Sequence, residues 1–262
     1  MIRILICFAV VHDTENVLKS DWENLTSQNP GIEHSNMIID TYDESALEYA
    51  LQCKEMASKV TCPIHLTALT IGQSLSATIY QNLFAVGIDR VVLLKEKAPV
   101  SFCPSRISRI IHKFTCDERF DAIFMGQQNS ITCNGQTGIR LSNLLNVPLI
   151  SYVNDVVFIN NKFHVKTKKR LQYTRAVIEQ PAIYCFFNAE RSYLRMATLR
   201  EKLKVQSREI DVFDVDKTFD QQENEINLIS LSYNPVTRNC QFINGQNAGE
   251  KAQVLLSLFM KD

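Results

Sequence analysis

Glycine is scarce in this sequence, and its scarcity limits the phosphate-binding motifs that the chain can contain. The chain has 8 glycines among 262 residues, about 3% against a usual share of about 7%. Neither GxxxxGK[ST] nor GxGxxG occurs in it, so it lacks the glycine-rich turns with which P-loop proteins and standard dinucleotide-binding domains hold phosphates. The sequence therefore argues against a P-loop kinase or GTPase and against a standard Rossmann dinucleotide site.

Net charge and long apolar runs are also lacking. The 28 Lys and Arg residues balance 28 Asp and Glu residues, so the overall charge attracts neither nucleic acid nor an anionic membrane. The first apolar run, 4–11, is too short to span a bilayer, lacks a basic n-region and is followed directly by His12 and Asp13. We expect a folded cytoplasmic protein with no membrane span and no bound nucleic acid.

The eight cysteines include no CxxC pair. The sequence therefore lacks the ligand spacing that is usual in zinc and iron–sulfur sites, and we expect no metal site. Because the cysteines are scattered and no secretory leader precedes the first apolar run, we expect a reducing compartment and mostly buried thiols.

Over the first 148 residues, short apolar runs alternate with stretches of helical periodicity. The opening run is apolar almost throughout, as in a strand that is buried on both faces of a parallel sheet. Thr41 opens a capping box ahead of the first strong helix, and Gly87 ends the second helix. This alternation predicts an α/β fold with an open, mainly parallel sheet and flanking helices. The predicted strands are Arg3–Phe8, Ile64–Thr70, Arg90–Leu94 and Phe120–Met125, and the predicted helices are Asp43–Ala57, Gln73–Val86, Pro104–Cys116 and Gly138–Leu145.

The pattern changes after residue 148. Two strand-like stretches, 149–159 and 162–171, are separated by Asn160-Asn161, which suits a two-residue hairpin turn. The remaining predicted elements are a buried strand (Ala182–Phe187), a basic helical stretch (Leu194–Lys204), an acidic linker or arm (Asp211–Asn227) and a last short helix (Ala248–Phe259).

In open parallel sheets, ligands bind beyond the carboxyl ends of the strands, which here means the loops after the first, second and fourth predicted strands. The loop from Gly126 to Gly138 is the strongest candidate, because it is rich in small and amide side chains and leads into a helix N-terminus, which suits a phosphate. An alternative interpretation is that Asn134 and Thr137 merely cap that helix while Gly135 makes a turn.

Several motifs occur in the order found in one protein family. The segment Tyr42–Glu55 resembles the family's FDEYALEEALRLKE helix, Leu69–Gly72 its SVGP turn, and Ala85–Arg90 its MGADR strand entry. Asp13-Thr14 after the opening strand is similar to its VPDT loop, and Gly126–Gly138 matches both ends of its GKQAIDDDCNQTG loop. Over most of its length the chain therefore resembles the β subunit of electron-transfer flavoproteins, including the nitrogen-fixation-associated homologues.

The resemblance implies a Rossmann-like fold of the adenine-nucleotide α-hydrolase type and a role in electron transfer. β subunits of this family pair with an α subunit that carries a redox FAD, and they hold AMP or, in bifurcating members, a second FAD. Their redox partners are acyl-CoA dehydrogenase-type enzymes or ferredoxin. Carried over residue by residue, the resemblance places the nucleotide against Cys7, Asp40, Thr41, Tyr42, Asp43, Ile71, Gly126, Gln127, Gln128, Asn134, Gly135, Gln136 and Thr137.

The resemblance also divides the chain. It implies an α/β nucleotide-binding domain over residues 1–190 and, over 191–262, a partner-recognition segment, an arm and a short helix that contact the α subunit. Asn188–Tyr193 loosely resembles the NEPRY motif that precedes the family's dehydrogenase-recognition loop. Tyr42 stands where the family has an aromatic residue near the partner's flavin.

Departures from the family leave two alternatives open. Ala9-Val10 stands where the family has a basic residue, and Ile131 and Cys133 stand where it has acidic residues. One alternative is therefore a ligand-free interaction subunit that kept the fold. The other is a nucleotide-consuming α/β enzyme, which would need a phosphate-contacting lysine or a glycine-rich turn after the first strand. We expect instead a non-catalytic electron-transfer subunit.

Two other features have simpler interpretations. His12 is the histidine on a predicted pocket loop and could meet a phosphate or transfer a proton, but a solvent-facing position explains it as well. The basic residues between Lys166 and Arg175 surround Tyr173 and could form a nucleic-acid stripe. Zero net charge and the lack of an RNA-binding motif favour a solvated or subunit-facing edge instead.

Overall fold

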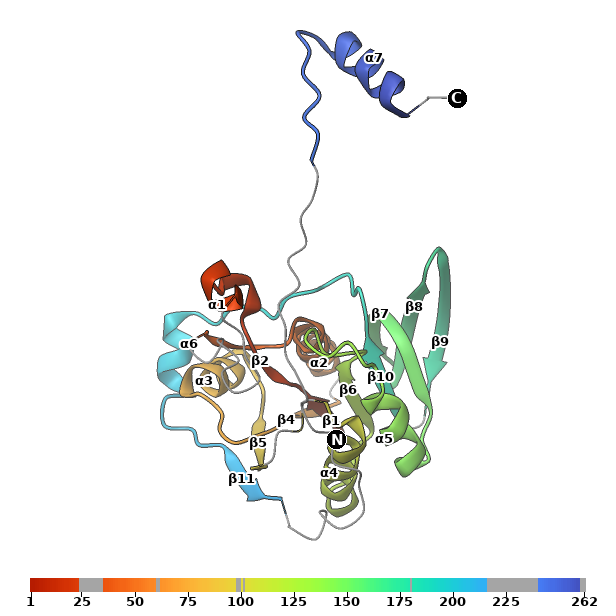
Figure 1. Cartoon of the computed structure of the whole chain (residues 1–262). Helices are drawn as coiled ribbons and strands as arrows, with labels where there is room; N and C mark the ends of the chain where they lie inside the picture. The colour runs from red at the N-terminus through yellow and green to blue at the C-terminus, as the bar shows by residue number, and fades with distance from the viewer. Residues whose placement is uncertain are drawn as a thin grey trace.

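The computed structural model describes residues 1–23, 35–59, 62–97, 100, 102–179, 181–215 and 240–259. Nine of its strands form one sheet (Figure 1), with parallel pairing from the first to the seventh strand across the sheet and antiparallel pairing beyond. The predicted α/β fold with an open, mainly parallel sheet is confirmed. The strands across the sheet are β11 (Asp211–Asp214), β5 (Arg90–Lys95), β4 (Ile64–Gly72), β1 (Ile2–Cys7), β6 (Ala122–Gly126), β10 (Ala182–Phe186), β7 (Leu149–Ile159), β8 (Lys162–Lys169) and β9 (Gln172–Ile178).

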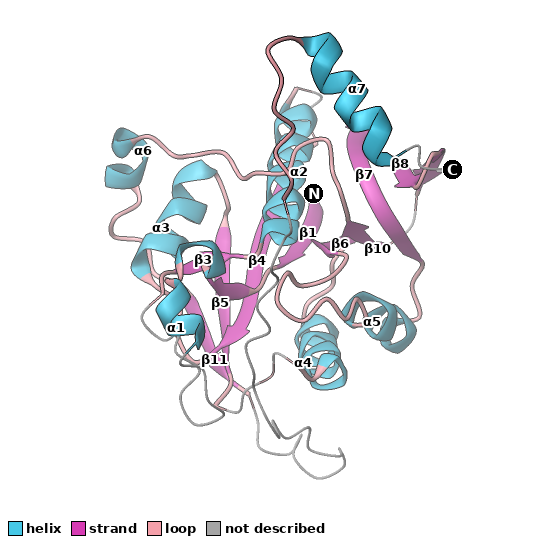
Figure 2. Ribbon diagram, turned by 45° about the horizontal axis from the view of Figure 1, so that its top comes forward, coloured by secondary structure: helices cyan, strands magenta, loops and turns pink. Residues whose placement is uncertain are grey.

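Helices cover both faces of the sheet (Figure 2). α2 (Thr41–Ser58) and α3 (Ala77–Val86) pack on the face that contains Ile4 and Ile6 of β1. α4 (Pro104–Asp117) and α5 (Thr137–Leu145) pack on the face that contains Leu5 and Cys7. Successive side chains of a strand point to opposite faces, so the apolar run of β1 is explained by two separate cores. The other elements are η1 (Thr14–Asn16), α1 (Lys19–Glu23), α6 (Leu199–Lys204), α7 (Ala248–Phe259) and the antiparallel pair β2 (Val10–His12) and β3 (Met37–Ile39).

Sequence and structure differ mainly at the starts of helices. The N-cap of α2 is Asp40 and not the predicted Thr41, because the Asp40 carboxylate accepts the backbone N–H of Tyr42 at 3.1 Å. α3 begins at Ala77 rather than at Gln73, since Ser76 caps it. Gly87 ends α3 in the left-handed conformation, with φ +114°, as predicted.

α6 is shorter than the predicted helix, which began at Leu194. The backbone N–H groups of Leu194 and Arg195 donate to the side chains of Glu44 and Glu48 on α2, at 3.3 and 3.2 Å. These contacts hold the residues before Thr198 outside the helix, and Thr198 then opens a capping box for α6.

The predicted hairpin turn is confirmed. Asn160 and Asn161 join β7 to β8 with φ angles of 51° and 61°, as a type I′ turn requires. The chain then continues into β9, which the sequence did not predict. Every residue of β9 except Ile178 is exposed, and the strand lacks the long apolar run of the central strands.

The acidic stretch that begins at Asp211 is a strand at its start, not a linker. β11 pairs in parallel with β5, and Arg90 binds the Asp211 carboxylate at 2.5 Å. Phe213 packs near Phe114, with ring centroids 6.4 Å apart. The part of the predicted arm from 216 to 227 lies outside the described residues. The last helix, α7, has the predicted bounds.

The cysteines are free thiols, but the prediction that most are buried is wrong. Cys7, Cys53 and Cys185 are buried, whereas the other five lie on helix surfaces, in loops or in the C-terminal segment and are partly or fully exposed. No helix among the described residues is both long and apolar enough to cross a bilayer.

Candidate functional site

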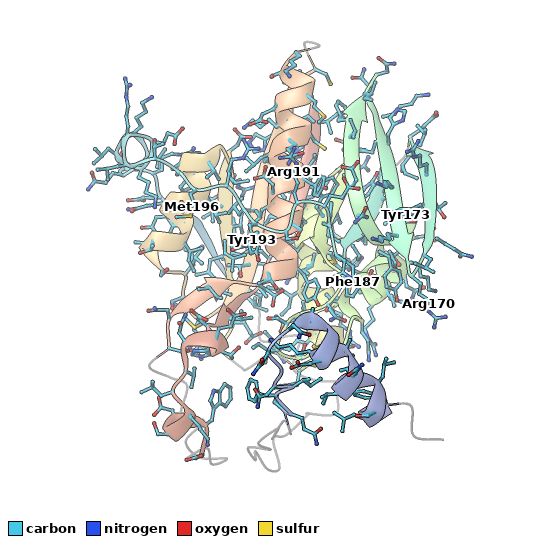
Figure 3. All side chains as sticks on the ribbon, turned by 90° about the horizontal axis from the view of Figure 1, so that it is seen from above. Arg170, Tyr173, Phe187, Arg191, Tyr193 and Met196 are labelled. Carbon is cyan, nitrogen blue, oxygen red and sulfur yellow. The ribbon has the colours of Figure 1, made fainter. Side chains whose placement is uncertain are left out.

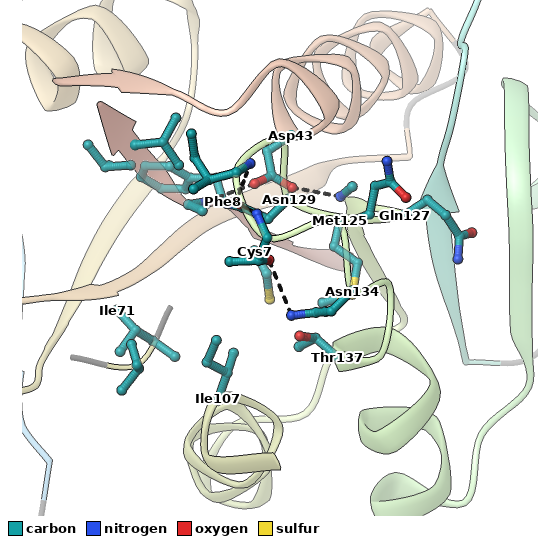
Figure 4. Close-up of a pocket in the computed structure, with 18 of the residues that line it drawn as sticks. Cys7, Phe8, Asp43, Ile71, Ile107, Met125, Gln127, Asn129, Asn134 and Thr137 are labelled. Carbon is teal, nitrogen blue, oxygen red and sulfur yellow. Dashed lines mark hydrogen bonds between the residues drawn. The ribbon is translucent and has the colours of Figure 1, made fainter. Parts of the chain in front are cut away.

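A cavity of about 320 Å³ lies at the carboxyl ends of β1, β4 and β6 (Figure 4). The chain passes from β1 to β4 and β5 on one side of the sheet and then crosses to β6 on the other side of β1. The cavity therefore occupies the point where the strand order reverses, which is the usual ligand position in open α/β sheets. The predicted position of the site, on the loops after these three strands, agrees with this geometry.

The walls of the cavity differ in polarity. Apolar side chains form one side: Val10, Val11, Met37, Leu69, Ile71, Ile107 and Ile111. Polar and small residues of the loop after β6 form the other: Gly126, Gln127, Gln128, Asn129, Thr132, Asn134 and Gly135. Such a cavity suits a flat apolar group that also carries hydrogen-bonding edges.

Asp43, in the first turn of α2, joins two of the surrounding loops. Its carboxylate oxygens accept the backbone N–H groups of Ala9 and Gly126 at 2.8 and 2.7 Å (Figure 4). Burial raises the pKa of Asp43 to about 8, the nearby Asp40 adds to the increase, and the two backbone hydrogen bonds oppose it. Asp43 is thus a buried carboxyl that positions the ends of β1 and β6.

Asp40 fixes the next part of the same loop. Its side chain is fully buried, and one carboxylate oxygen accepts both the backbone N–H and the hydroxyl of Ser130, at 2.7 and 2.5 Å. Asn129 then accepts the N–H groups of Ile131 and Thr132 at 2.9 and 3.2 Å, which is an Asx-turn. These contacts give the loop a defined shape.

Gly126 is required where β6 meets α2. A Cβ atom at this position would lie 2.7 Å from Cβ of Tyr42 and 2.8 Å from Oδ1 of Asp43, closer than real side chains approach each other. Gly135 has φ +61°, a conformation that L side chains rarely adopt. Both glycines thus shape the polar wall of the cavity.

α5 begins at the polar end of the cavity. Its N-cap, Gln136, makes no side-chain capping hydrogen bond, and Thr137 lines the cavity. Because Gln136 is the N-cap, neither Asn134 nor Thr137 occupies the cap position. Asn134 instead accepts the backbone N–H of Gln136 at 3.2 Å, in the turn ahead of the helix. Backbone donors of the first helical turn are therefore available to an anion.

Among the described residues, no Lys or Arg lines the cavity. The lining residues that can carry charge are Asp43, Cys7 and His12. Burial raises the pKa of the Cys7 thiol, with Asp43 and Cys185 adding to the increase, so this thiol stays neutral. Nδ1 of His12 lies 2.9 Å from the Ser35 hydroxyl. A bound anion would therefore depend on backbone N–H groups, hydroxyls and the His12 ring.

The structure brings most of the predicted site residues to the cavity. Four of them do not line it. The Asp40 side chain binds Ser130, Thr41 and Tyr42 lie outside, and the Gln136 amide oxygen accepts from Arg140 at 3.3 and 3.4 Å. The nine that line it are Cys7, Asp43, Ile71, Gly126, Gln127, Gln128, Asn134, Gly135 and Thr137.

Apart from Ile71, the residues of the apolar wall were not predicted from the sequence. Ile107 and Ile111 lie one turn apart on α4 and face the cavity, and their spacing of four residues could have indicated a common face. Met37 comes from β3, a three-residue strand too short for a periodic pattern. His12, considered on the sequence alone as a solvent-facing residue, is a lining residue.

Comparison with known proteins identifies the family. The electron transfer flavoprotein domain matches residues 31–217. The chain is 24% identical over 265 residues to the Escherichia coli (strain K12) protein named "Putative electron transfer flavoprotein subunit YgcR", covering 99% of this chain and 98% of that protein.

Two further relatives agree with this match. The chain is 26% identical to the acryloyl-CoA reductase electron transfer subunit gamma of Anaerotignum propionicum, over 89% of this chain and 85% of that protein. It is 30% identical to the electron transfer flavoprotein subunit beta of Bacillus subtilis (strain 168), over 44% of each chain. The chain therefore belongs to the electron transfer flavoprotein family, as a divergent subunit similar to the beta subunits.

Proposed function

We propose that this electron-transfer flavoprotein subunit binds an adenine nucleotide in the cavity at the carboxyl ends of β1, β4 and β6, and that it pairs with a second subunit that carries a redox FAD. The flavin supplies the electron transfer, and this chain contributes binding and orientation. The observation that carries the proposal is the position of the cavity, which combines an apolar wall with the uncapped N-terminus of α5 at the reversal of strand order.

The chemistry of the cavity fits the parts of AMP. The apolar wall with Ile71, Ile107 and Ile111 suits the flat base, and the side-chain amides of Gln127 and Gln128 offer donors and acceptors for its edge. The phosphate would lie at the start of α5, against Thr137 and the backbone N–H groups of the first turn.

The size of the cavity favours AMP over a second FAD. Small-molecule sites typically span about 300 to 1,000 Å³, and this cavity of about 320 Å³ lies at the lower limit. FAD joins an AMP half to a flavin mononucleotide half, so it needs about twice the space of AMP. A second FAD would therefore have to extend out of this cavity.

The C-terminal helix supports a heterodimer. None of the described residues of α7 is buried, and Val254, Leu255 and Phe259 are among its exposed apolar side chains. Figure 1 shows α7 standing clear of the sheet. A helix with such a surface needs a partner, and we propose that it contacts the FAD-carrying subunit.

The residues Asn188–Thr198, called here the docking segment, are proposed to bind the redox partner. Tyr193 and Met196 are 77% and 83% exposed (Figure 3). The segment is nevertheless held firmly, since Arg195 donates to Glu48 from Nε and Nη2, at 3.0 and 2.8 Å, and also binds Glu55. An exposed apolar surface on a fixed segment suits a protein partner. One relative is a subunit of an acryloyl-CoA reductase, so we propose an acyl-CoA dehydrogenase-type partner.

The absence of Lys and Arg from the cavity lining, among the residues that the structure describes, favours one second candidate, an interaction subunit that has lost its nucleotide. A single experiment separates the two. The chain is purified with its partner subunit, denatured, and the released AMP and FAD are quantified by chromatography. One AMP and one FAD per heterodimer supports the proposal, one FAD without AMP supports the ligand-free subunit, and two FAD indicates a bifurcating member.

A further inference from the structure

Three aromatic side chains, Tyr42, Tyr152 and Phe187, form a cluster immediately outside the cavity. The rings of Tyr42 and Phe187 are stacked, with centroids 5.5 Å apart and an interplanar angle of 6°. Tyr152 meets Phe187 edge-on, at 5.7 Å and 85°. Each such pair contributes about 0.5 to 1.5 kcal/mol beyond its burial. Phe187 is therefore the central member of this aromatic cluster, and it lies between the docking segment and β8–β9 (Figure 3).

The aromatic cluster holds both glutamines of the cavity wall. The Tyr42 hydroxyl accepts from Nε2 of Gln128 at 3.2 Å, and the backbone N–H of Tyr152 donates to Oε1 of Gln127 at 3.1 Å. Both glutamines line the cavity, whereas none of the three aromatic residues does. The cluster thus contacts the cavity wall through Gln127 and Gln128.

The same cluster leads directly into the docking segment. Phe187 donates its backbone N–H to Val153 at 3.0 Å, and the next carbonyl, that of Asn188, accepts from the Asn154 side chain at 2.6 Å. Glu190 then donates its N–H to the Asn154 carbonyl at 3.0 Å. Val153 and Asn154, adjacent residues of β7, therefore fix the backbone from Phe187 to Glu190.

We propose that Phe187 is a positioning residue, which sets Gln128 through Tyr42 and ties the polar wall of the cavity to the docking segment. The proposal rests on the proposed nucleotide site. A nucleotide that contacts the glutamines holds the aromatic cluster in one arrangement and thereby restrains residues 188–195. By linkage, a partner bound to the segment strengthens nucleotide binding by the same factor as the nucleotide strengthens partner binding.

The test is hydrogen–deuterium exchange of the full chain, purified with its partner subunit and stripped of nucleotide, with and without added AMP. AMP binding is measured in parallel by calorimetry. We expect AMP to slow amide exchange in peptides covering residues 188–195 by about threefold to tenfold, as for a small change in local opening. In Phe187→Leu, which keeps an apolar side chain but loses the stacking, AMP should still bind while this protection disappears.

Two further variants serve as controls. Phe187→Tyr retains the ring and should retain the protection. Phe114→Leu removes a comparable ring from the contact with Phe120 and Phe213, away from the cavity. This variant should also retain the protection of residues 188–195. Unchanged exchange of residues 188–195 in the unmodified protein despite bound AMP, or full protection in Phe187→Leu, would overturn the role of Phe187. A failure of the unmodified protein to bind AMP would instead overturn the nucleotide site on which that role depends.

Discussion

Asp43 accepts the backbone N–H of Gly126 at 2.7 Å, and this contact joins the first turn of α2 to the end of β6. The second carboxylate oxygen of Asp43 binds the N–H of Ala9. One buried side chain therefore positions two of the three loops that surround the cavity.

We expect Asp43 to make the stability of the protein depend on pH. Its pKa is raised from 3.8 to about 8 in the folded state, so the folded protein holds the proton more tightly than the unfolded chain. The protonated Asp43 carboxyl contributes fully to the stability of the fold below 3.8, the pKa that it has in the unfolded chain. This contribution is lost as pH rises towards 8. The free energy of unfolding should fall by up to about 1.4 kcal/mol per pH unit over this range, relative to Asp43→Asn.

Urea unfolding of both proteins at several values between about pH 5 and pH 8 measures this difference. Asn preserves the shape of the side chain but does not titrate. Parallel pH curves for the two proteins would show that the Asp43 pKa is not raised.

Gly126→Ala should damage both the fold and the site. The added Cβ would lie 2.7 Å from Cβ of Tyr42, and relieving this contact should cost about 1 to 3 kcal/mol. Gly72→Ala is the matched control, because the nearest atom to its added Cβ is 3.9 Å away. Thermal melts and AMP titrations should show a lower melting temperature and weaker AMP binding for Gly126→Ala alone. Equal effects of the two substitutions would contradict the close approach of Gly126 to Tyr42.

Thr137 and Gln136 should differ in their effect on the nucleotide. Both were expected from the sequence to contact it, but Thr137 lines the cavity while the Gln136 amide binds Arg140. A hydrogen bond to a charged phosphate contributes about 1.5 to 3 kcal/mol, so Thr137→Val should weaken AMP binding by about 10- to 100-fold. Gln136→Ala should change it by less than about threefold. Calorimetry that gives the reverse order would place the phosphate away from the start of α5.

The sequence predicted the central strands because each is an apolar run with two buried faces. β1, β4, β5, β6 and β10 all have this character. β9 was missed because its sequence, QYTRAVI, has neither a long apolar run nor a regular alternation of apolar and polar residues. β11 was missed because it is acidic, and its place beside β5 depends on Arg90, far away in the sequence.

The site was predictable in its loops but not in its walls. The order of strands placed the ligand after β1, β4 and β6, and these are the loops that surround the cavity. Whether a side chain faces the cavity depends on neighbours distant in sequence. Asp40 turns away because Ser130, 90 residues later, provides its hydrogen bonds, and no local pattern contains that information.

Two truncations should separate the sheet from the arm. Removing all residues from 211 onward deletes β11, including the ion pair of Asp211 with Arg90, and exposes the edge of β5. The melting temperature of this shorter variant should fall. Ending the chain after Val215 keeps β11 and should leave the melting temperature nearly unchanged while abolishing capture of the FAD-carrying subunit. Retained capture by this second variant would contradict a role of the C-terminal residues in the heterodimer.

Photolabelling with 8-azido-AMP tests the nucleotide site most directly. The purified heterodimer is irradiated with the probe, digested, and the labelled peptides are identified by mass spectrometry, with excess AMP as the competitor. We predict AMP-sensitive labelling of peptides that line the cavity, which are those covering residues 7–12, residue 71, residues 107–111 or residues 126–137. Competed labelling confined to other parts of the chain or to the partner subunit, or no competed labelling at all, would contradict the account.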